Sequence, residues 1–318
     1  MTIGVLGEAL IDFIRDDHNA YHPHLGGSPF NVAIALSRQG IPVSYLSPLS
    51  NDSFGNQLAN TLRREGVKVA IDRRSPWPTS MALVTIDEGG APSYRIYREG
   101  VADKDITYGQ IRDHLPTGVE IFHTGSLAIT PSQLPKIRQL FALMRSSGVL
   151  ISMDINIRLG ASINQQTYLD GVQSLLPMAD IVKASDEDLM PLQLASDTAG
   201  SAKKALEMIG EGILLVTEGS HGATLMSAGT TIRKPAYSAA PMVDTVGAGD
   251  TFHAAFLASL YRHQATKPPA RWNDPELLDQ SLEMACAASA INVSRAGCCP
   301  PNLEEVEAFL RTKKPAKP

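Results

Sequence analysis

The hydrophobic positions of this chain fall mostly into short runs that alternate with stretches of helical periodicity. The runs are rich in β-branched and other apolar residues, which is typical of strands that are buried on both faces. We expect such strands at residues 3–6, 43–49, 120–124, 149–154, 180–184 and 212–217. Helical periodicity occurs near residues 29–39, 54–65, 131–147, 165–177 and 197–210. This alternation predicts a mostly parallel sheet that is covered by helices on both faces.

Two regions break this rhythm, because they are polar and their apolar residues alternate with period two. Gly89 and Gly90 lie inside the second region and indicate a hairpin between two of its strands. Because no helices follow these strands, we interpret both regions as a small β-lid at the edge of the sheet. The predicted division is an α/β core at residues 1–12, 26–67 and 101–312, a lid at 13–25 and 68–100, and a disordered tail at 313–318.

The composition is typical of a globular enzyme with a large core, since 43% of the 318 residues are hydrophobic and 19% are charged. A formal net charge of -5 argues against a nucleic acid or an anionic membrane as partner. The three cysteines fit no disulfide framework and no zinc-site spacing, which favours the cytoplasm. The N-terminal stretch is typical of a strand and not of a signal peptide. No apolar run approaches the ~20 residues that span a bilayer.

Glycine and polar residues are frequent where the predicted strands end. In an open α/β sheet, ligands bind outside the carboxyl ends of the strands. We therefore expect one crevice to collect these residues, which are Asp12, Gly26, Gly27, Gly125, Asp154, Asn156, Ser185, Thr217, Gly219 and Asp250.

The segment GGSPFN at residues 26–31 opens a predicted helix. Ser28 is expected to cap the helix and Pro29 to occupy its first turn. Asn31 points towards the apolar side of the helix, where its amide could bind a ligand hydroxyl such as that of a sugar. On this motif alone, a plain turn with a locally bonded Asn31 is the alternative. Asp12 likewise either binds two hydroxyls of a ligand or caps a local turn.

The segment DTVGAGDTF at residues 244–252 is more specific. Gly247, Ala248 and Gly249 precede an apolar helix, and their amides could converge on an anion at its N-terminus. Asp250 lies beside them, where a carboxylate could accept a proton from an attacking hydroxyl. Phosphoryl transfer needs both features. The alternative is that Asp250 only caps the helix.

Other nucleotide-binding signatures are missing from the sequence. There is no G-x-x-x-x-G-K-[ST], no G-x-G-x-x-G after the first strand, and no H-R-D or D-F-G. These absences argue against Walker-type nucleotide-binding proteins, Rossmann dehydrogenases and protein kinases.

Together, the two segments and their order resemble those of the ribokinase (PfkB) family of carbohydrate kinases, over nearly the whole chain. The resemblance implies a ribokinase-like three-layer α/β/α fold with a mostly parallel central sheet of about nine strands and a β-lid. It also implies that the chain phosphorylates a sugar with ATP, with Mg²⁺ as cofactor and K⁺ as a further candidate.

The resemblance assigns roles to individual residues. Asp250 would be the base, and Gly247, Ala248 and Gly249 would form the anion hole. The residues that would bind the substrate are Asp12, Gly26, Gly27 and Asn31, with Arg158 reaching a phosphate and Tyr97 and Arg98 closing over the sugar from the edge of the lid. Those that would contact the nucleotide are Ser185, Thr217, Gly219 and Gly222. Those that would hold a monovalent cation are Asp244, Val246, Asn292, Arg295 and Gly297.

One motif departs from the family pattern. Many members carry N-x-x-E after a central strand, and this chain has Ser185 and Asp188 at those positions. Asp188 could still orient the waters of Mg²⁺. Fructokinase-like members commonly show Ser-Asp-Glu here.

Three segments, GGSPFNVA at 26–33, the lid segment at 93–103 and DINIR at 154–158, also resemble the fructokinase branch. We therefore expect phosphorylation of D-fructose to fructose 6-phosphate. The alternative substrates are 2-keto-3-deoxygluconate, ribose and aminoimidazole riboside. A sugar sensor without catalysis should have lost the base or the anion hole, and an NAD-linked oxidoreductase should show the glycine fingerprint. The exposed lid strands predict a homodimer that forms through the lids.

Overall fold

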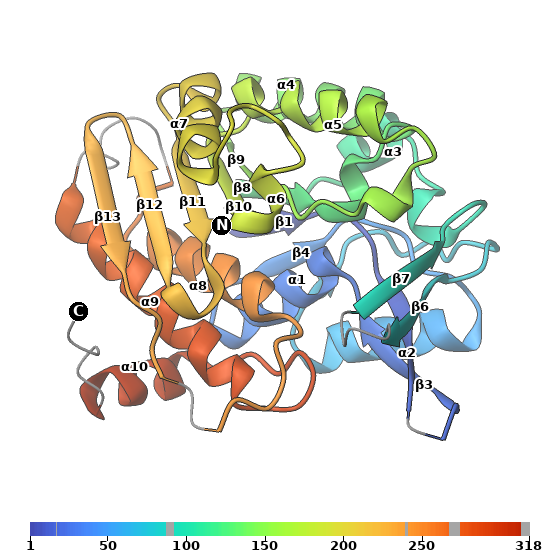
Figure 1. Ribbon diagram of the computed structural model, residues 1–318. Helices are drawn as coiled ribbons and strands as arrows, with labels where there is room; N and C mark the ends of the chain where they lie inside the picture. Colours follow the sequence, from blue (N-terminus) through green and yellow to red (C-terminus); the bar gives the residue numbers. More distant parts are fainter. Residues whose placement is uncertain (17, 87–91, 239–240, 267–273, 313–318) are drawn as a thin grey trace.

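The computed structural model describes residues 1–16, 18–86, 92–238, 241–266 and 274–312, and two sheets organise them (Figure 1). The larger sheet has nine strands in the order β13-β12-β11-β10-β9-β8-β1-β4-β5. These are β1 (Thr2–Val5), β4 (Val43–Tyr45), β5 (Lys68–Val69), β8 (Val119–Gly125), β9 (Leu150–Asp154), β10 (Ile181–Ser185), β11 (Ile213–Thr217), β12 (Ala223–Ser227) and β13 (Thr230–Lys234).

Neighbouring strands of this sheet run parallel from β5 to β11, and only β12 and β13 pair antiparallel. The prediction of a mostly parallel sheet is therefore confirmed. All six expected strands are present, although the second ends at Tyr45 and not at residue 49. The hairpin of β12 and β13 extends the edge of the sheet beyond the strands that were predicted.

Helices cover both faces of the larger sheet and give the molecule three layers (Figure 1). One face carries α3 (Tyr108–Asp113), α4 (Leu134–Ser146), α5 (Gln165–Gln173), α6 (Asp186–Leu189) and α7 (Thr198–Ile209). The other carries α1 (Ser28–Arg38), α2 (Ser53–Arg64), α8 (Ala248–Arg262), α9 (Pro275–Val293) and α10 (Leu303–Thr312). Among the described helices, none combines the length and apolar character that crossing a membrane requires.

Successive residues of each central strand point to opposite faces, and each face has its own hydrophobic core. Ile121 packs into the core beneath α1 and α8, whereas Phe122 packs into the core beneath α4 and α5. The next strand repeats the pattern, with Leu150 on the first side and Ile151 on the second. Burial on both sides explains why these strands appear in the sequence as continuous apolar runs.

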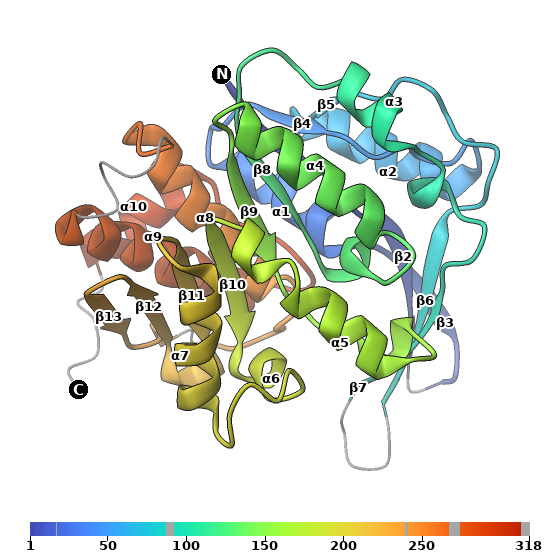
Figure 2. The same cartoon turned by 90° about the horizontal axis from the view of Figure 1, so that it is seen from above.

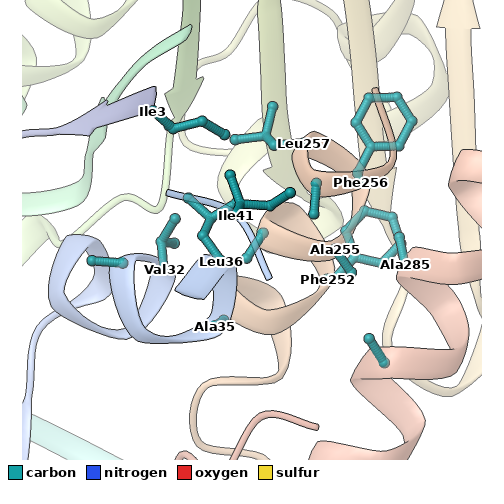
Figure 3. Close-up of a cluster of buried hydrophobic side chains, with 14 of the residues drawn as sticks. Ile3, Val32, Ala35, Leu36, Ile41, Phe252, Ala255, Phe256, Leu257 and Ala285 are labelled. Carbon is teal, nitrogen blue, oxygen red and sulfur yellow. The ribbon is translucent and has the colours of Figure 1, made fainter. Parts of the chain in front are cut away.

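The contact between α1 and α8 brings two distant segments of the chain together. Figure 3 shows Val32 and Leu36 of α1 facing Phe252, Phe256 and Leu257 of α8 beneath the sheet. Burying a side chain of this size stabilises the fold by about 1.5–3 kcal/mol. This packing fixes the N-termini of both helices beside each other, which matters for the site described below.

The smaller sheet forms the predicted lid, and it lies at the end of the molecule opposite β13 (Figures 1 and 2). Its order is β3-β2-β6-β7, with β2 (Leu10–Arg15), β3 (Tyr21–Gly26), β6 (Ser80–Ile86) and β7 (Pro92–Tyr97). Only β2 and β6 pair parallel.

The structure moves two boundaries of the predicted lid. Leu10 to Asp12 belong to the lid strand β2, and Lys68–Val69 belong to the larger sheet as β5. The strands β6 and β7 pair antiparallel as a hairpin predicts. Gly89, Gly90 and the tail at 313–318 lie outside the described residues.

Candidate active site

A cavity of about 270 Å³ lies at the carboxyl ends of the central strands, beneath the lid. It is lined by the loop after β1, by lid strands, by the N-termini of α1 and α8, and by the segments after β8 and β9. The predicted residues that it brings together are Asp12, Gly27, Asn31, Asn156, Arg158, Val246, Gly247, Ala248, Gly249 and Asp250. Further polar residues that line it were not predicted as site residues, and these are Glu8, Ser28, Ser126, Lys183 and Thr245.

Asp250 lies in the first turn of α8, and two side chains of α1 hold its carboxylate. The hydroxyl of Ser28 donates to Oδ1 at 2.7 Å, and the amide of Asn31 donates to Oδ2 at 2.8 Å. The side chain is 8% exposed and faces the cavity. Both oxygens are therefore fixed in orientation, which a general base requires.

The predicted cap by Ser28 is wrong. The N-cap of α1 is Gly27, which has a φ of 110° and forms no side-chain cap bond. Gly27 is needed there because a Cβ would also come within 2.6 Å of the Glu8 carbonyl oxygen. Pro29 does occupy the start of the helix. The hydroxyl of Ser28 therefore donates to Asp250, and the side-chain amide of Asn31 donates to the same carboxylate.

Burial raises the pKa of Asp250, and the nearby Asp154 carboxylate acts in the same direction. The hydrogen bonds from Ser28 and Asn31 act against this rise, because they stabilise the ionised form. A raised pKa makes Asp250 a stronger base than an exposed aspartate. It also means that Asp250 is protonated over a wider range of acidic pH.

The predicted anion hole begins at Gly247, which is the N-cap of α8 and has left-handed backbone angles. A Cβ on Gly247 would come within 2.2 Å of the Cys298 sulfur, so no side chain fits there. The Ala248 amide donates to the Thr245 carbonyl at 3.2 Å, a bond that a phosphate oxygen would have to share or replace. Amides and the helix dipole make this end of α8 favourable for an anion.

Lys183 is a cation in this site that the sequence interpretation missed. Its ammonium lies beside the anion hole, because a Cβ on Gly249 would come within 2.9 Å of Nζ. The same ammonium pairs with Asp154 at 3.1 and 3.2 Å from the two carboxylate oxygens. Burial alone raises the pKa of Asp154, but Lys183 overcomes this effect and lowers it to about 2. A lysine inside the apolar strand sequence IVKAS was the signal that could have revealed it.

Buried polar side chains support Asp154 from behind. His253 lies 3.9 Å from Asp154, and its other ring nitrogen lies 2.9 Å from the hydroxyl of Ser152. His123 contacts the same hydroxyl at 3.0 Å. Burial lowers the pKa of both histidines, which favours their neutral forms. The two histidines and Ser152 are thus bonded to one another, and His253 contacts Asp154 without a hydrogen bond, since its Nδ1 has no hydrogen-bond partner among the described residues.

Asp12 lies in the cavity on lid strand β2. Gly26 makes room for it, because a Cβ on Gly26 would come within 2.4 Å of an Asp12 oxygen. Burial raises the pKa of Asp12 to about 6, although the guanidinium of Arg158 lowers it and Asp250 raises it further. Asp12 and Asp250 therefore line the same small cavity, and the guanidinium of Arg158 supplies a positive charge there.

The prediction for Tyr97 and Arg98 needs a correction, because neither lines the cavity. The Arg98 side chain is buried and donates to Asp103, to Ser80 and to the Leu127 carbonyl oxygen. Arg98 therefore anchors the base of the lid to the core. Tyr97 is 54% exposed.

The predicted nucleotide residues lie at the ends of β10 and β11. Thr217 ends β11, and Gly219 and Gly222 flank the turn that follows it, both with positive φ. The Ser185 hydroxyl and amide instead donate to Asp188, whose second oxygen accepts from the Ile157 amide at 2.7 Å. Neither Ser185 nor Asp188 lines the cavity, and both serve to fix the start of α6.

The residues predicted to hold a monovalent cation do come together, from the loop before α8, the last turn of α9 and the loop that follows α9. Asp244 accepts from the amides of Val246 and Gly297, and the Asn292 amide donates to the Val246 carbonyl at 2.8 Å. Gly297 has a positive φ, and the Arg295 side chain donates to the Cys299 carbonyl and to Glu305. These loops lead directly into the anion hole.

A buried carboxylate base beside an anion hole and a cation, at the floor of a polar cavity, defines a phosphotransferase that acts on an alcohol group. Residues 2–305 match the model of the pfkB family carbohydrate kinases. The chain belongs to this family.

Comparison with individual proteins agrees with this assignment. The chain is 34% identical to a fructokinase of Rhizobium leguminosarum bv. trifolii over 258 residues, which cover 80% of this chain and 78% of the relative. The crystal structure of a Xylella fastidiosa fructokinase with bound ATP has a TM-score of 0.88 at 27% identity and covers 98% of both chains. A Vibrio cholerae O395 fructokinase in a fructose-, ADP- and calcium-bound form has a TM-score of 0.84 at 25% identity, over 97% of this chain and 98% of that one. The expected ribokinase-like fold is confirmed.

Proposed function

We propose that this protein is a fructokinase that transfers the γ-phosphoryl group of ATP to the 6-hydroxyl of D-fructose. The observation that carries the proposal is the placement of Asp250, which two α1 side chains hold against the anion hole inside a polar cavity. The fructokinases of R. leguminosarum, X. fastidiosa and V. cholerae support fructose as the sugar.

In the proposed reaction, Asp250 accepts the proton of the sugar hydroxyl while the hydroxyl oxygen attacks the γ-phosphorus. The bond between the γ-phosphorus and the oxygen that bridges it to the β-phosphate breaks, so ADP leaves with that oxygen and the hydroxyl proton passes to the Asp250 carboxylate. Asp12, Arg158 and the backbone at Gly27 orient the sugar. Amides at the start of α8 and the Lys183 ammonium stabilise the charge on the transferred group. The lid excludes water that would otherwise attack ATP.

The turn after β11 is the proposed contact for the nucleotide. Gly222 allows the chain to approach itself there, because a Cβ would come within 2.0 Å of the Lys234 carbonyl oxygen. Thr217 at the end of β11 pairs in register with Ser185 at the end of β10. The two strands therefore end side by side, next to this turn.

The residues present suit a magnesium ion that enters with ATP. The described residues contain no cluster of three His, Cys, Asp or Glu side chains that could hold a metal by themselves. Mg²⁺ is commonly bound through one or two carboxylates, waters and substrate phosphates. Asp188 would contribute through a water, while Lys183 and the anion hole carry the rest of the phosphate charge. When bound, the ion would neutralise charge between the phosphates.

The segments around Asp244 and Asn292 are the proposed site for K⁺. Their carbonyl oxygens are the type of ligand that a hard cation binds. A cation that holds these segments in place would also fix the position of Gly247. Two further expectations stay proposals, namely the homodimer through the lids and the cytoplasmic location.

Measurement of ADP release with a panel of sugars tests the proposed function. D-fructose should give the highest kcat/KM, above ribose, 2-keto-3-deoxygluconate and aminoimidazole riboside. A higher value for one of the other three would replace fructose by that substrate. Absence of ADP release with all four would contradict the proposal.

A further inference from the structure

Glu8 is a buried acid that the proposed mechanism does not use. It lies in the loop between β1 and β2, its side chain is 1% exposed, and it lines the sugar cavity. Its Oε1 atom accepts one long hydrogen bond from the Leu127 amide, at 3.5 Å. Within the described part of the chain, its Oε2 atom has no partner at hydrogen-bond geometry, although the Ser126 hydroxyl lies close enough to lower the pKa of the carboxyl. A buried polar atom without a partner is uncommon and costs free energy, so it requires an explanation.

The nearest cation does not supply the missing partner. Arg98 is close enough to act on the charge of Glu8, but its guanidinium donates to Asp103, to Ser80 and to the Leu127 carbonyl. Burial is the largest influence on Glu8 and raises its pKa to about 7, although Arg98 lowers it. The fold thus keeps an acid with an unused oxygen at a cost to stability.

The position of Glu8 indicates which end of the sugar it faces. Asp12 lines the cavity together with Asp250 and Arg158, which lie at its reacting end. Glu8 instead accepts from the Leu127 amide, and the carbonyl of Leu127 accepts from Arg98 at the base of the lid. Glu8 therefore faces the part of the cavity that is remote from the transferred phosphoryl group.

We propose that Glu8 is a further substrate-binding residue, whose free oxygen accepts a hydrogen bond from a sugar hydroxyl remote from the phosphorylated one. This inference rests on the proposed function. For fructose phosphorylated at the 6-hydroxyl, the remote hydroxyls are those on C1 and C2.

The test combines sugar affinity with thermal stability for Glu8→Gln. Glutamine keeps the shape of the side chain and can still accept from the Leu127 amide, but it removes the charge. Isothermal titration well above pH 7, where Glu8 is ionised, should show a fructose Kd that rises about tenfold or more, since a hydrogen bond to a charged group is among the stronger ones. The Tm of the variant without sugar should equal or exceed that of the wild type, because an unpartnered buried carboxylate has been removed. Glu99→Gln is the matched control, since that side chain is fully exposed at the lid base, and both of its values should stay at those of the wild type.

A second arm uses the wild-type protein and analogues that lack one remote hydroxyl, namely 1-deoxy-D-fructose and 2,5-anhydro-D-mannitol. At least one should bind about tenfold more weakly than fructose, and Glu8→Gln should lose that discrimination. If both analogues bind the wild type as tightly as fructose, the inference is overturned, even where Glu8→Gln fails to fold. An unchanged fructose Kd in a folded Glu8→Gln, or a lowered Tm with unchanged affinity, also overturns it and assigns Glu8 a structural role. If the wild type binds no neutral sugar at all, the proposed function itself fails.

Discussion

Replacement of Lys183 by methionine should show how much this lysine contributes to kcat and how much it contributes to the stability of the fold. The ammonium lies beside Gly249, so a phosphate in the anion hole would come close to it. At an effective dielectric constant near 20, two unit charges about 4 Å apart interact by about 4 kcal/mol. The Asp154 countercharge offsets part of this energy, so we expect kcat to fall by about 10²-fold.

The single variant carries a second effect that has to be controlled. Lys183→Met leaves Asp154 as an unpaired carboxylate with no solvent exposure, and breaking a buried pair in this way costs about 3–5 kcal/mol of stability. The double variant Lys183→Met/Asp154→Asn removes both charges and should recover most of the lost Tm. Its kcat should remain about 10²-fold low.

The assay is steady-state release of ADP at saturating fructose and ATP, with Tm measured on the same preparations. Lys183→Arg keeps the positive charge and should retain more activity than Lys183→Met. A folded double variant whose kcat stays within about threefold of the wild type would refute the catalytic role of Lys183, and the lysine would then serve only to neutralise Asp154.

Three further predictions concern the rest of the site. Gly247→Ala should lower kcat at least tenfold, because the new Cβ would meet the Cys298 sulfur and displace the anion hole. The double variant with Cys298→Gly should recover part of the activity, and a double variant without any recovery would contradict this explanation. The kcat/KM for fructose should fall as the pH drops through about 6, where Asp12 takes up a proton and loses its charge. Asp12→Asn should have a low value and an acidic limb of changed midpoint, because only the protonation of Asp250 then remains, and an unchanged midpoint would assign the limb to a group other than Asp12. Replacement of K⁺ by Na⁺ should lower kcat in a direct chromatographic ADP assay, whereas equal rates would exclude a selective cation site in the loops around Asp244.

The fold could be predicted from the sequence wherever a local pattern of apolar residues was enough to identify a strand or helix. Buried parallel strands gave continuous apolar runs, so β1, β4, β8, β9, β10 and β11 were all found. Only β4 was predicted clearly too long, because it ends at Tyr45. The hairpin of β12 and β13 was missed because the edge strand β13 (TTIRK) has a single apolar residue and no buried one, and β12 (ATLMS) lacks a continuous apolar run. The lid boundary was misplaced at Asp12 because the chain passes from the loop after β1 into β2 without a polar break.

The candidate site was predictable to the extent that its chemistry lay within short motifs. Asp250 and the anion hole follow from one segment of the chain. The partner of Ser28 did not, since Asp250 lies 222 residues away and only the packing of α1 on α8 brings the two together. Arg98 was assigned to the sugar because the sequence does not show that Asp103 and the Leu127 carbonyl occupy its guanidinium. Glu8 and Lys183 lie in or next to apolar strands, where their positions depend on neighbours that are distant in sequence.

The most direct test of the central claim compares the wild type with Asp250→Asn in the same experiment. Phosphorus NMR should show that the wild type converts D-fructose and ATP into fructose 6-phosphate and ADP in equal amounts. Asp250→Asn should bind fructose with a Kd close to that of the wild type, while its kcat falls by a factor on the order of 10³ or more. Turnover by Asp250→Asn within about tenfold of the wild type would contradict the assignment of Asp250 as the base.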